Sequence, residues 1–248
     1  MVNVGYTMII AEPFRAMLQF TTILPMGRPA DYDAFARHAY MLPLSGYLVG
    51  GIAGLFAMLF GESLIAGAVV LSVALMLTGF NHFDGLCDLG DGLMAHGSRE
   101  KRVNALTDRT LGAGAVGTAV VVMLLAYAGI TTVAWIAGAI LIAEVMGKFA
   151  QVLLIVIGHP FRDGMFSYIH AFARWWFIPL SCLLIIPLIF LPVSLFSAGA
   201  AMAATLLTTG VLLIVTRRLF GGVNGDIVGA SNELTRCMVL LALALTGF

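Results

Sequence analysis

Three aspartates at helical spacing are the residues of this sequence best suited to chemistry. Asp84, Asp88 and Asp91 occupy positions i, i+4 and i+7, so one continuous helix would carry all three on the same face. Carboxylates this close repel one another unless a cation lies between them. Mg²⁺ prefers oxygen ligands and typically bridges carboxylates to substrate phosphates. The spacing therefore predicts a magnesium site formed by these aspartates, and a solvated helix end is the plainer alternative.

Glycines and basic residues surround the aspartates. Gly85, Gly90 and Gly92 lack side chains and would let either a substrate or a neighbouring helix come close. Next to a metal-type cluster, the basic side chains of the following segment would hold phosphate oxygens. These side chains are Arg99, Lys101, Arg102 and Arg109. Alone, such a segment is equally typical of an ordinary cytoplasmic loop in a membrane protein.

A second polar set opens the last apolar run. Gly221-Gly222-Val223-Asn224-Gly225-Asp226 is followed by Glu233, which lies seven residues after Asp226 and so on the same helical face. Ionisable residues at membrane depth usually face a partner or a cavity. A glycine-rich loop before a helix can also cradle phosphate, although a short glycine run is weak evidence. Glu144 and Lys148, at i and i+4, either neutralise each other or leave Lys148 to contact phosphate.

The composition places these residues in a membrane protein. Of the 248 residues, 60% are hydrophobic and only 10% are charged, whereas soluble domains carry about 25% charged residues. The apolar residues form runs of the length that crosses a bilayer, about 20 residues, so the lipid bilayer is the expected partner. A net charge of zero indicates no nucleic-acid partner. The three scattered cysteines give neither a disulfide framework nor zinc spacing.

The apolar runs predict an all-α, polytopic membrane bundle of about seven transmembrane helices in a single domain, residues 1–248. The predicted spans cover about 39–61, 63–83, 111–129, 131–157, 175–197, 199–216 and 227–246. Pro187 and Pro192 are expected to kink the fifth span, and Glu144 and Lys148 to lie near the inner end of the fourth. A shorter amphipathic segment, 9–24, predicts an N-terminal interfacial helix with Glu12, Arg15 and Gln19 on one side.

Charge is distributed unequally between the two ends of this predicted bundle. The connections near 61–62, 129–131 and 197–199 share one end with the C-terminus at Phe248, and together they hold one charged residue, Glu62. Most arginines and lysines fall in the segments at the other end, which are 25–38, 84–110, 158–174 and 217–226. The positive-inside rule makes that end, with the aspartate cluster, the cytoplasmic face of the cell membrane.

The order of these motifs resembles that of the cobalamin synthase family, the adenosylcobinamide-GDP ribazoletransferases. The matching blocks are Leu18-Gln19-Phe20 with Leu24-Pro25, Leu42-Pro43-Leu44-Ser45-Gly46, Asp84–Gly92, Arg99-Glu100-Lys101-Arg102 with Asp108 and Gly112, and Gly221–Asp226 with Gly229-Ala230 and Glu233-Leu234. They extend over nearly the whole chain. Lys148 is a departure, since the family usually shows an arginine there, and a lysine cannot make the same bidentate phosphate contact.

The resemblance implies a Mg²⁺-dependent membrane enzyme that joins adenosylcobinamide-GDP to α-ribazole or its 5′-phosphate. The products would be adenosylcobalamin, or its 5′-phosphate, and GMP. We expect Asp84, Asp88 and Asp91 to hold the metal and Asp91 or Asp226 to accept the proton of the attacking ribazole hydroxyl. Substrate contacts are expected from Arg99, Arg102, Arg109, Lys148, Asn224 and Glu233. The preferred ribazole form and a homo-oligomeric state stay open.

Two other classes of membrane protein share parts of the pattern. Asp88-x-x-Asp91-Gly92-x-x-Ala95 copies the first half of the CDP-alcohol phosphotransferase signature, with His96 where that family has arginine, but the second half is missing. A CDP-alcohol phosphotransferase or a prenyl-diphosphate transferase is therefore the alternative enzyme. An ion-coupled transporter is less favoured, because it should show helices broken at mid-membrane and often inverted repeats, and no repeat is visible.

Overall fold

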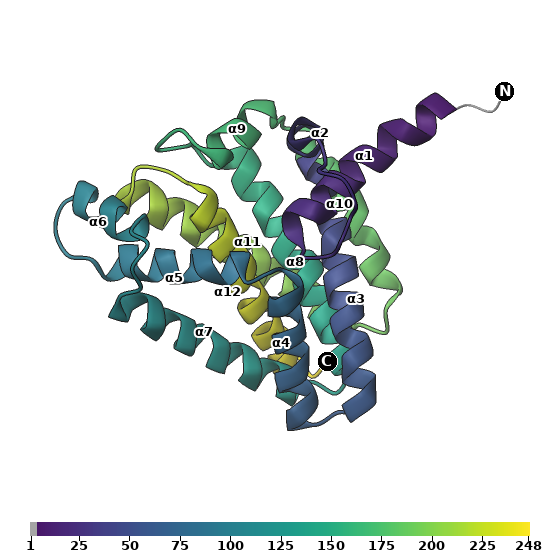
Figure 1. Cartoon of the computed structure of the whole chain (residues 1–248). Coiled ribbons are helices and arrows are strands. Elements are labelled where there is room, and N and C mark those ends of the chain that lie inside the picture. Colours follow the sequence, from purple (N-terminus) through teal and green to yellow (C-terminus); the bar gives the residue numbers. More distant parts are fainter. Residues whose placement is uncertain (1–3) are drawn as a thin grey trace.

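The computed structural model describes the backbone of residues 4–248 and the side chains of residues 12–248. This part of the chain is a bundle of helices without a named strand (Figure 1). Five segments within it are long and apolar enough to cross a membrane: Ala39–Phe60 (η1, Ala39–Met41, with α3, Leu42–Phe60), α7 (Ala113–Thr132), α8 (Ile136–Ile157), α11 (Leu195–Leu219) and α12 (Gly225–Leu245). The predicted all-α membrane bundle is thereby confirmed.

Two bent helix pairs bring the number of candidate spans from five to seven. One pair joins α4 (Leu64–Leu77) to α5 (Asn81–Met94) at 93°, and the other joins α9 (Met165–Phe172) to α10 and η2 (Phe177–Phe190) at 94°. The predicted count of seven therefore holds if each bent pair crosses the membrane once, although neither pair has the bounds of the predicted span, 63–83 or 175–197.

Helix α8 is the central element of the bundle and is almost completely buried (Figure 1). Small residues let its neighbours approach closely. A Cβ added at Gly46 of α3 would lie 2.6 Å from the Val145 Cα, and one at Gly50 would lie 2.8 Å from the Leu141 Cα. Such close backbone contact is typical of membrane helices, where packing rather than hydrophobic exclusion drives association. It holds α3 firmly against the polar middle of α8.

The predicted second span, 63–83, is wrong in its continuity, because the chain turns sharply after Leu77. Gly79 and Phe80 both adopt left-handed backbone angles, with φ of +60° and +58°. The Phe80 amide donates to the Leu75 carbonyl at 3.0 Å, which closes the end of α4 in the manner of a helix C-cap. A new helix then begins, so Asp84 lies in the first turn of α5, where the helix dipole favours a carboxylate.

The fifth span is interrupted at one of its two prolines. Helix α10 (Phe177–Ile185) gives way to the 3₁₀ helix η2 (Ile186–Phe190) around Pro187, because proline has no N–H to continue the α-helical ladder. The helix type therefore changes at Pro187, and the predicted kink there stays a prediction. Pro192 lies beyond η2, in the connection to α11, so its predicted kink within the helix is wrong.

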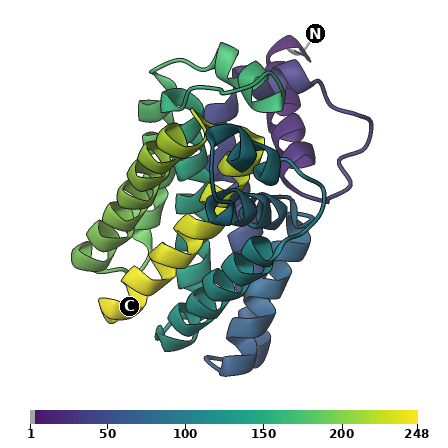
Figure 2. The same ribbon diagram turned by 90° about the vertical axis from the view of Figure 1, so that its left-hand side faces the viewer.

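The connections that carry little charge meet at one end of the bundle (Figure 2, lower part). The Glu62 carboxylate accepts a hydrogen bond of 2.8 Å from the Ile136 amide at the start of α8. The Ala134 amide donates to the Phe248 carbonyl at 2.7 Å. These contacts place the α3–α4 and α7–α8 connections beside the C-terminus, as the sequence predicted.

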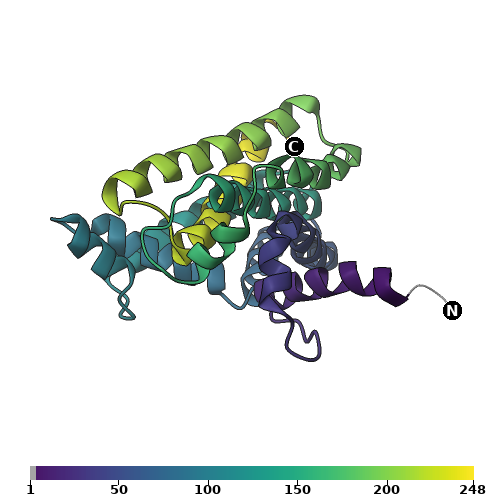
Figure 3. The same cartoon turned by 90° about the horizontal axis from the view of Figure 1, so that it is seen from above.

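The opposite end is covered by short helices that pack on one another. Helix α2 (Tyr32–Arg37) begins at Asp31, whose side chain accepts from the Asp33 amide. It contacts α9 through the Arg37 guanidinium, which lies 4.4 Å from the centre of the Phe172 ring. Helix α6 (Arg99–Leu106) lies at this end as well, on the side of the bundle away from α1 (Figure 3).

The predicted N-terminal helix is α1 (Val4–Thr21), and the side chains of residues 9–11 within the prediction lie outside the described residues. Its polar side chains fasten the following loop. The Arg15 guanidinium pairs with Glu12 at 2.6 Å and donates to the Met26 carbonyl, and the Gln19 Oε1 accepts from the Ala30 amide at 2.6 Å. The interfacial position of α1 stays a prediction.

Candidate active site

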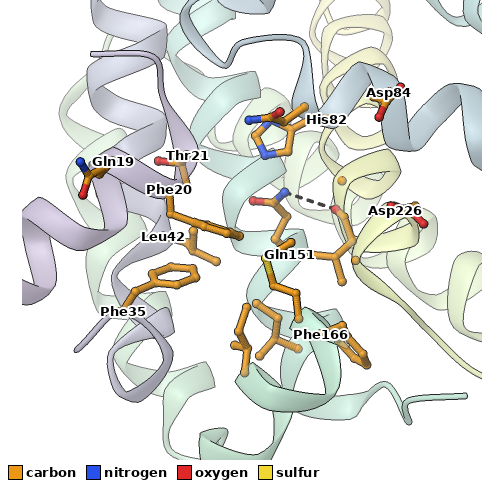
Figure 4. A pocket seen from close by; sticks show the side chains of 17 residues that line it. Gln19, Phe20, Thr21, Phe35, Leu42, His82, Asp84, Gln151, Phe166 and Asp226 are labelled. Atoms are coloured by element: carbon orange, nitrogen blue, oxygen red, sulfur yellow. Dashed lines mark hydrogen bonds between the residues drawn. The ribbon is translucent and has the colours of Figure 1, made fainter. Parts of the chain in front are cut away.

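A cavity of about 420 Å³ opens between α1, α2, α3, α5, α8, α9 and α12 (Figure 4). Its polar end carries Asp84 and Asp226, its apolar end carries Phe20, Phe35 and Leu42, and Gln151 lies between the two ends. Pockets of about 300–1,000 Å³ with apolar walls and a few placed polar groups are typical small-molecule sites. The cavity is therefore the natural centre of the candidate site.

Close packing of α5 on α12 brings the aspartates of the two helices together. A Cβ at Gly85 would overlap the Asp226 backbone carbonyl, so only glycine permits this contact. Asp84 and Asp226 consequently line the same cavity, and Asp88, half-buried, lies within electrostatic reach of both. The sequence left open whether a substrate or a neighbouring helix comes close to Gly85, and the structure shows a neighbouring helix there.

Asp91 has a different environment from the other two aspartates of α5. Its Oδ2 accepts from the Gly112 amide at 2.7 Å, and its Oδ1 accepts from the Ala115 amide at 2.8 Å. Both oxygens therefore cap the first turn of α7, where unpaired amides and the helix dipole favour a carboxylate. The predicted roles of Asp91 as metal ligand and base stay predictions, and they compete with this structural role.

Asp226 is held in place by residues on both sides. The Asn224 side chain caps α12, with its Oδ1 accepting from the Ile227 amide at 3.1 Å, and its Nδ2 donates to the Asp226 Oδ2 at 2.6 Å. The Arg162 Nη2, from the α8–α9 connection, lies 3.8 Å from the same oxygen. Asn224 therefore orients Asp226, and Arg162 is a basic group at the site that the sequence analysis did not single out.

Two glycines of the loop before α12 differ in their surroundings: one packs closely against a neighbouring segment, and the other has free space beside it. A Cβ at Gly222 would overlap the His159 carbonyl, and the neighbouring Val223 amide donates to that same carbonyl at 2.8 Å. At Gly225, by contrast, no atom lies within 4 Å of an added Cβ, and the residue lines the cavity. The room for a ligand is thus at Gly225 rather than at the glycine pair.

The predicted basic residues occupy three different settings. Arg99 is exposed and lies against Gly221 of the α11–α12 loop, where an added Cβ would come within 3.1 Å of its Nη1. Arg102 donates to the Leu93 carbonyl at 2.8 Å and so completes the end of α5. Arg109 is exposed in the α6–α7 connection. There the Thr110 backbone amide lowers the pKa of the neighbouring Asp108 carboxyl by hydrogen bonding to it.

The carboxylates at the cavity fit the donor preference of Mg²⁺ without forming a cage. Among the described residues, no group of three histidine, cysteine, aspartate or glutamate side chains converges on one metal position. Mg²⁺ usually keeps several waters and is bound through one or two carboxylates plus substrate phosphates. Asp84 and Asp226 in one cavity, with Asp88 beside them, supply hard oxygen donors of that kind.

A second polar centre lies inside the bundle, away from solvent. Arg236 of α12 forms an ion pair of 3.0 Å with Glu144 and a second one with Glu233, and these side chains are at most 1% exposed. The fully buried Lys148 lies 3.2 Å from the imidazole of His82, which in turn lines the cavity. Two buried carboxylates therefore balance two buried cations.

This interior cluster corrects one prediction and bears on two others. Glu144 and Lys148 lie in the middle turns of α8, so their predicted position near its inner end is wrong. The substrate roles of Lys148 and Glu233 stay predictions, but both side chains are enclosed. Arg236 was overlooked, although a charge count over α8 and α12 would have pointed to it. The sequence did not point to Gln151 and His82, because a single polar residue in an apolar run does not show whether it lines a site or only packs inside the bundle.

Comparison with known proteins decides the family. The sequence model described as Cobalamin-5-phosphate synthase matches residues 13–244. The chain belongs to the cobalamin-5-phosphate synthase family. The resemblance inferred from the motifs is confirmed, and the matched region includes every residue discussed at the site. The alternative reading as a CDP-alcohol or prenyl-diphosphate transferase is set aside.

Several curated relatives are similar over almost their whole length, and each is named adenosylcobinamide-GDP ribazoletransferase. The protein from Methanocella arvoryzae is 38% identical, with 91% of this chain and 92% of the relative covered. That from Halorubrum lacusprofundi is 35% identical, with 94% and 97% covered. That from Methanococcoides burtonii is 33% identical, with 92% and 90% covered. No solved structure matches the chain.

Proposed function

We propose that this membrane protein joins adenosylcobinamide-GDP to α-ribazole, or to its 5′-phosphate, and releases GMP in a Mg²⁺-dependent reaction. One observation carries the proposal: in a chain of this family, Asp84 and Asp226 from two different helices line one cavity. The transfer of a phosphoryl group to a hydroxyl needs a site where the negative charge of the phosphates is neutralised and where a base accepts the hydroxyl proton.

The reaction exchanges one phosphorus–oxygen bond for another. A ribazole hydroxyl oxygen forms a bond to the phosphorus attached to cobinamide, the bond from that phosphorus to the GMP oxygen breaks, and GMP leaves with the electron pair. The hydroxyl proton passes to a carboxylate. Asp226 is the better placed of the two predicted bases, because it lines the cavity while both oxygens of Asp91 accept backbone amides.

The remaining polar residues divide into those that hold charge and those that position. Asp84 and Asp88 would hold Mg²⁺ with Asp226 nearby, and the bound ion would neutralise the diphosphate and the departing GMP. Arg162, which lies 3.8 Å from Asp226, and the exposed Arg99 would pair with phosphate oxygens. Lys148 and Glu233 lie inside the bundle, where Lys148 contacts His82 and so positions a residue of the cavity wall.

The orientation of the protein belongs to the same proposal. Helices α2 and α6 and the segments that flank α9 carry basic side chains, and the positive-inside rule makes their end of the bundle cytoplasmic. A cysteine placed at the exposed Ser98, in the α5–α6 connection, should be protected in intact cells from a membrane-impermeant thiol reagent. Rapid labelling from outside would reverse the orientation.

Purified protein in liposomes tests the proposed reaction. Adenosylcobinamide-GDP and α-ribazole should yield adenosylcobalamin and one GMP per product, and removal of divalent cations should stop turnover. Parallel reactions with α-ribazole 5′-phosphate measure which acceptor form is preferred. Turnover at full rate in the presence of a chelator would contradict the metal requirement, and no product under any condition would contradict the function.

A further inference from the structure

We infer that the cavity is the binding site of the acceptor nucleoside, with the apolar base between Phe20 and Phe166 and the ribose towards Gln151 and Asp226. The inference rests on the proposed function and adds to it the position and recognition of one of the two substrates. It follows from the division of the cavity into an aromatic end and a carboxylate end, which Figure 4 shows.

The aromatic end offers flat apolar surface. Phe35 is buried, and the ring of Phe20 stacks on it with centroids 4.6 Å apart. The buried Phe166 lies across the cavity from Phe20 (Figure 4). Phe20 remains 36% exposed, so part of its ring is free for another partner. Ile155 and Ile169 complete the wall. Stacking of a base on an aromatic side chain strengthens binding about tenfold or more, and the exposed part of the Phe20 ring offers such a contact.

The same end has little to offer a guanine base. The Thr21 hydroxyl donates to its own helix at the Met17 carbonyl, 2.8 Å away, and the Gln19 Oε1 accepts from the Ala30 amide. A guanine placed here would lose hydrogen bonds from its donor and acceptor edge, which is unfavourable for a buried polar group. The benzimidazole base of ribazole carries no N–H donor and suits an apolar wall. The cobinamide part of the donor is larger than the cavity.

The middle of the cavity carries a preoriented hydrogen-bonding group. Gln151 is only 3% exposed, and its Nε2 donates to the Val228 carbonyl of α12 at 3.2 Å. This bond fixes the amide and leaves Oε1 as the acceptor available to a ribose hydroxyl. Asp226 lies beyond it at the carboxylate end (Figure 4). A nucleoside seated on the aromatic wall would therefore present its ribose to the group that takes the proton.

The chain offers a matched pair of variants for the test. Phe20→Ala removes the stacking ring from the cavity, whereas Phe56→Ala removes a phenylalanine of similar exposure, 41%, from the outer surface of α3. Gln151→Leu removes the acceptor with little change in volume. Binding of α-ribazole to detergent-purified protein is followed by the fluorescence of its base, and KM is measured separately for each substrate.

We expect Phe20→Ala and Gln151→Leu to weaken α-ribazole binding about tenfold or more and to raise the KM for that substrate alone. Phe56→Ala should match the wild type, and GMP should not displace α-ribazole. Unchanged ribazole binding in both cavity variants would overturn the inference. Displacement of α-ribazole by GMP, together with a raised KM for adenosylcobinamide-GDP, would also overturn it. In either case, product formation by the wild-type protein would still support the proposed function. A wild-type protein that neither binds ribazole nor forms product would overturn both.

Discussion

The two polar centres of the bundle differ in charge balance and in access. At the interior centre, Glu144 and Glu233 face Arg236 and Lys148, and all four side chains are enclosed. At the cavity, the carboxylates of Asp84, Asp88 and Asp226 face one half-exposed cation, Arg162. The charges of the interior centre balance within the protein, whereas the cavity has an excess of negative charge.

Under the proposed function, this difference separates structural ionisable residues from functional ones within one protein. A buried ion pair is costly to form and still more costly to break, because one partner alone leaves an uncompensated charge. An open carboxylate cluster instead lowers its own repulsion when it binds a cation. Substitutions at the two centres should therefore have opposite signatures, with lost stability at the interior and lost turnover at the cavity.

Arg236→Met should have the largest effect of the substitutions considered. It leaves Glu144 and Glu233 buried without their cation, and breaking such a pair typically costs 3–5 kcal/mol. The measurement is the melting temperature in detergent, with Arg162→Met as the control at the open centre. Equal melting temperatures for wild type and Arg236→Met would show that the interior pairs carry no stability.

Asp84→Asn and Asp88→Asn should lower turnover roughly a hundredfold or more, which corresponds to about 2.8 kcal/mol at about 1.4 kcal/mol per tenfold. The melting temperature should stay level or rise, because one of several repelling charges is removed. Turnover is recorded against Mg²⁺ concentration for folded, membrane-inserted protein. Wild-type rates with unchanged Mg²⁺ dependence in both variants would make the cluster an ordinary solvated helix face.

Asp91→Asn should show a structural effect in the same helix, α5, in which Asp84→Asn and Asp88→Asn should show a functional one. Since both carboxylate oxygens cap α7, the variant should lose about 1 kcal/mol of stability, as lost helix caps do. Its turnover should depend on Mg²⁺ as in the wild type. A lost Mg²⁺ response with an unchanged melting temperature would instead establish Asp91 as the third metal ligand predicted from its spacing.

Glu62→Gln should have the smallest effect. The Glu62 carboxylate lies at the low-charge end of the bundle and accepts from the first amide of α8. A charge at a helix N-terminus contributes about 0.3–1 kcal/mol, so a small drop in melting temperature is expected with turnover unchanged. Reduced turnover at equal stability would show that the far end of α8 is coupled to the cavity.

The sequence predicted the long helices better than the bends between short ones. An apolar run shows where a helix can cross the membrane, and α3, α7, α8, α11 and α12 follow such runs. Hydropathy does not register the left-handed angles of Gly79 and Phe80, which end α4 and start the helix that carries the aspartates. The Thr78-Gly79 pair was the available signal, since glycine commonly follows a helix end.

Part of the site was predictable from spacing, and part depends on contacts between distant segments. The single face shared by Asp84 and Asp88 follows from helical periodicity, and α5 confirms the helix. The cap that Asp91 provides involves amides more than twenty residues further along the chain, which no local pattern reveals. The cavity likewise forms from seven separate helices, so its lining could not be assembled from the sequence alone.

Direct titration of a metal tests the central claim, that the open carboxylate centre binds a divalent cation for the transfer. Mn²⁺ can stand in for Mg²⁺, and its electron paramagnetic resonance signal reports binding to detergent-purified protein in the presence of adenosylcobinamide-GDP. We predict saturable binding to the wild type and to Asp91→Asn, and strongly weakened binding to Asp84→Asn and Asp88→Asn. Equal Mn²⁺ affinity in all four proteins would contradict the account.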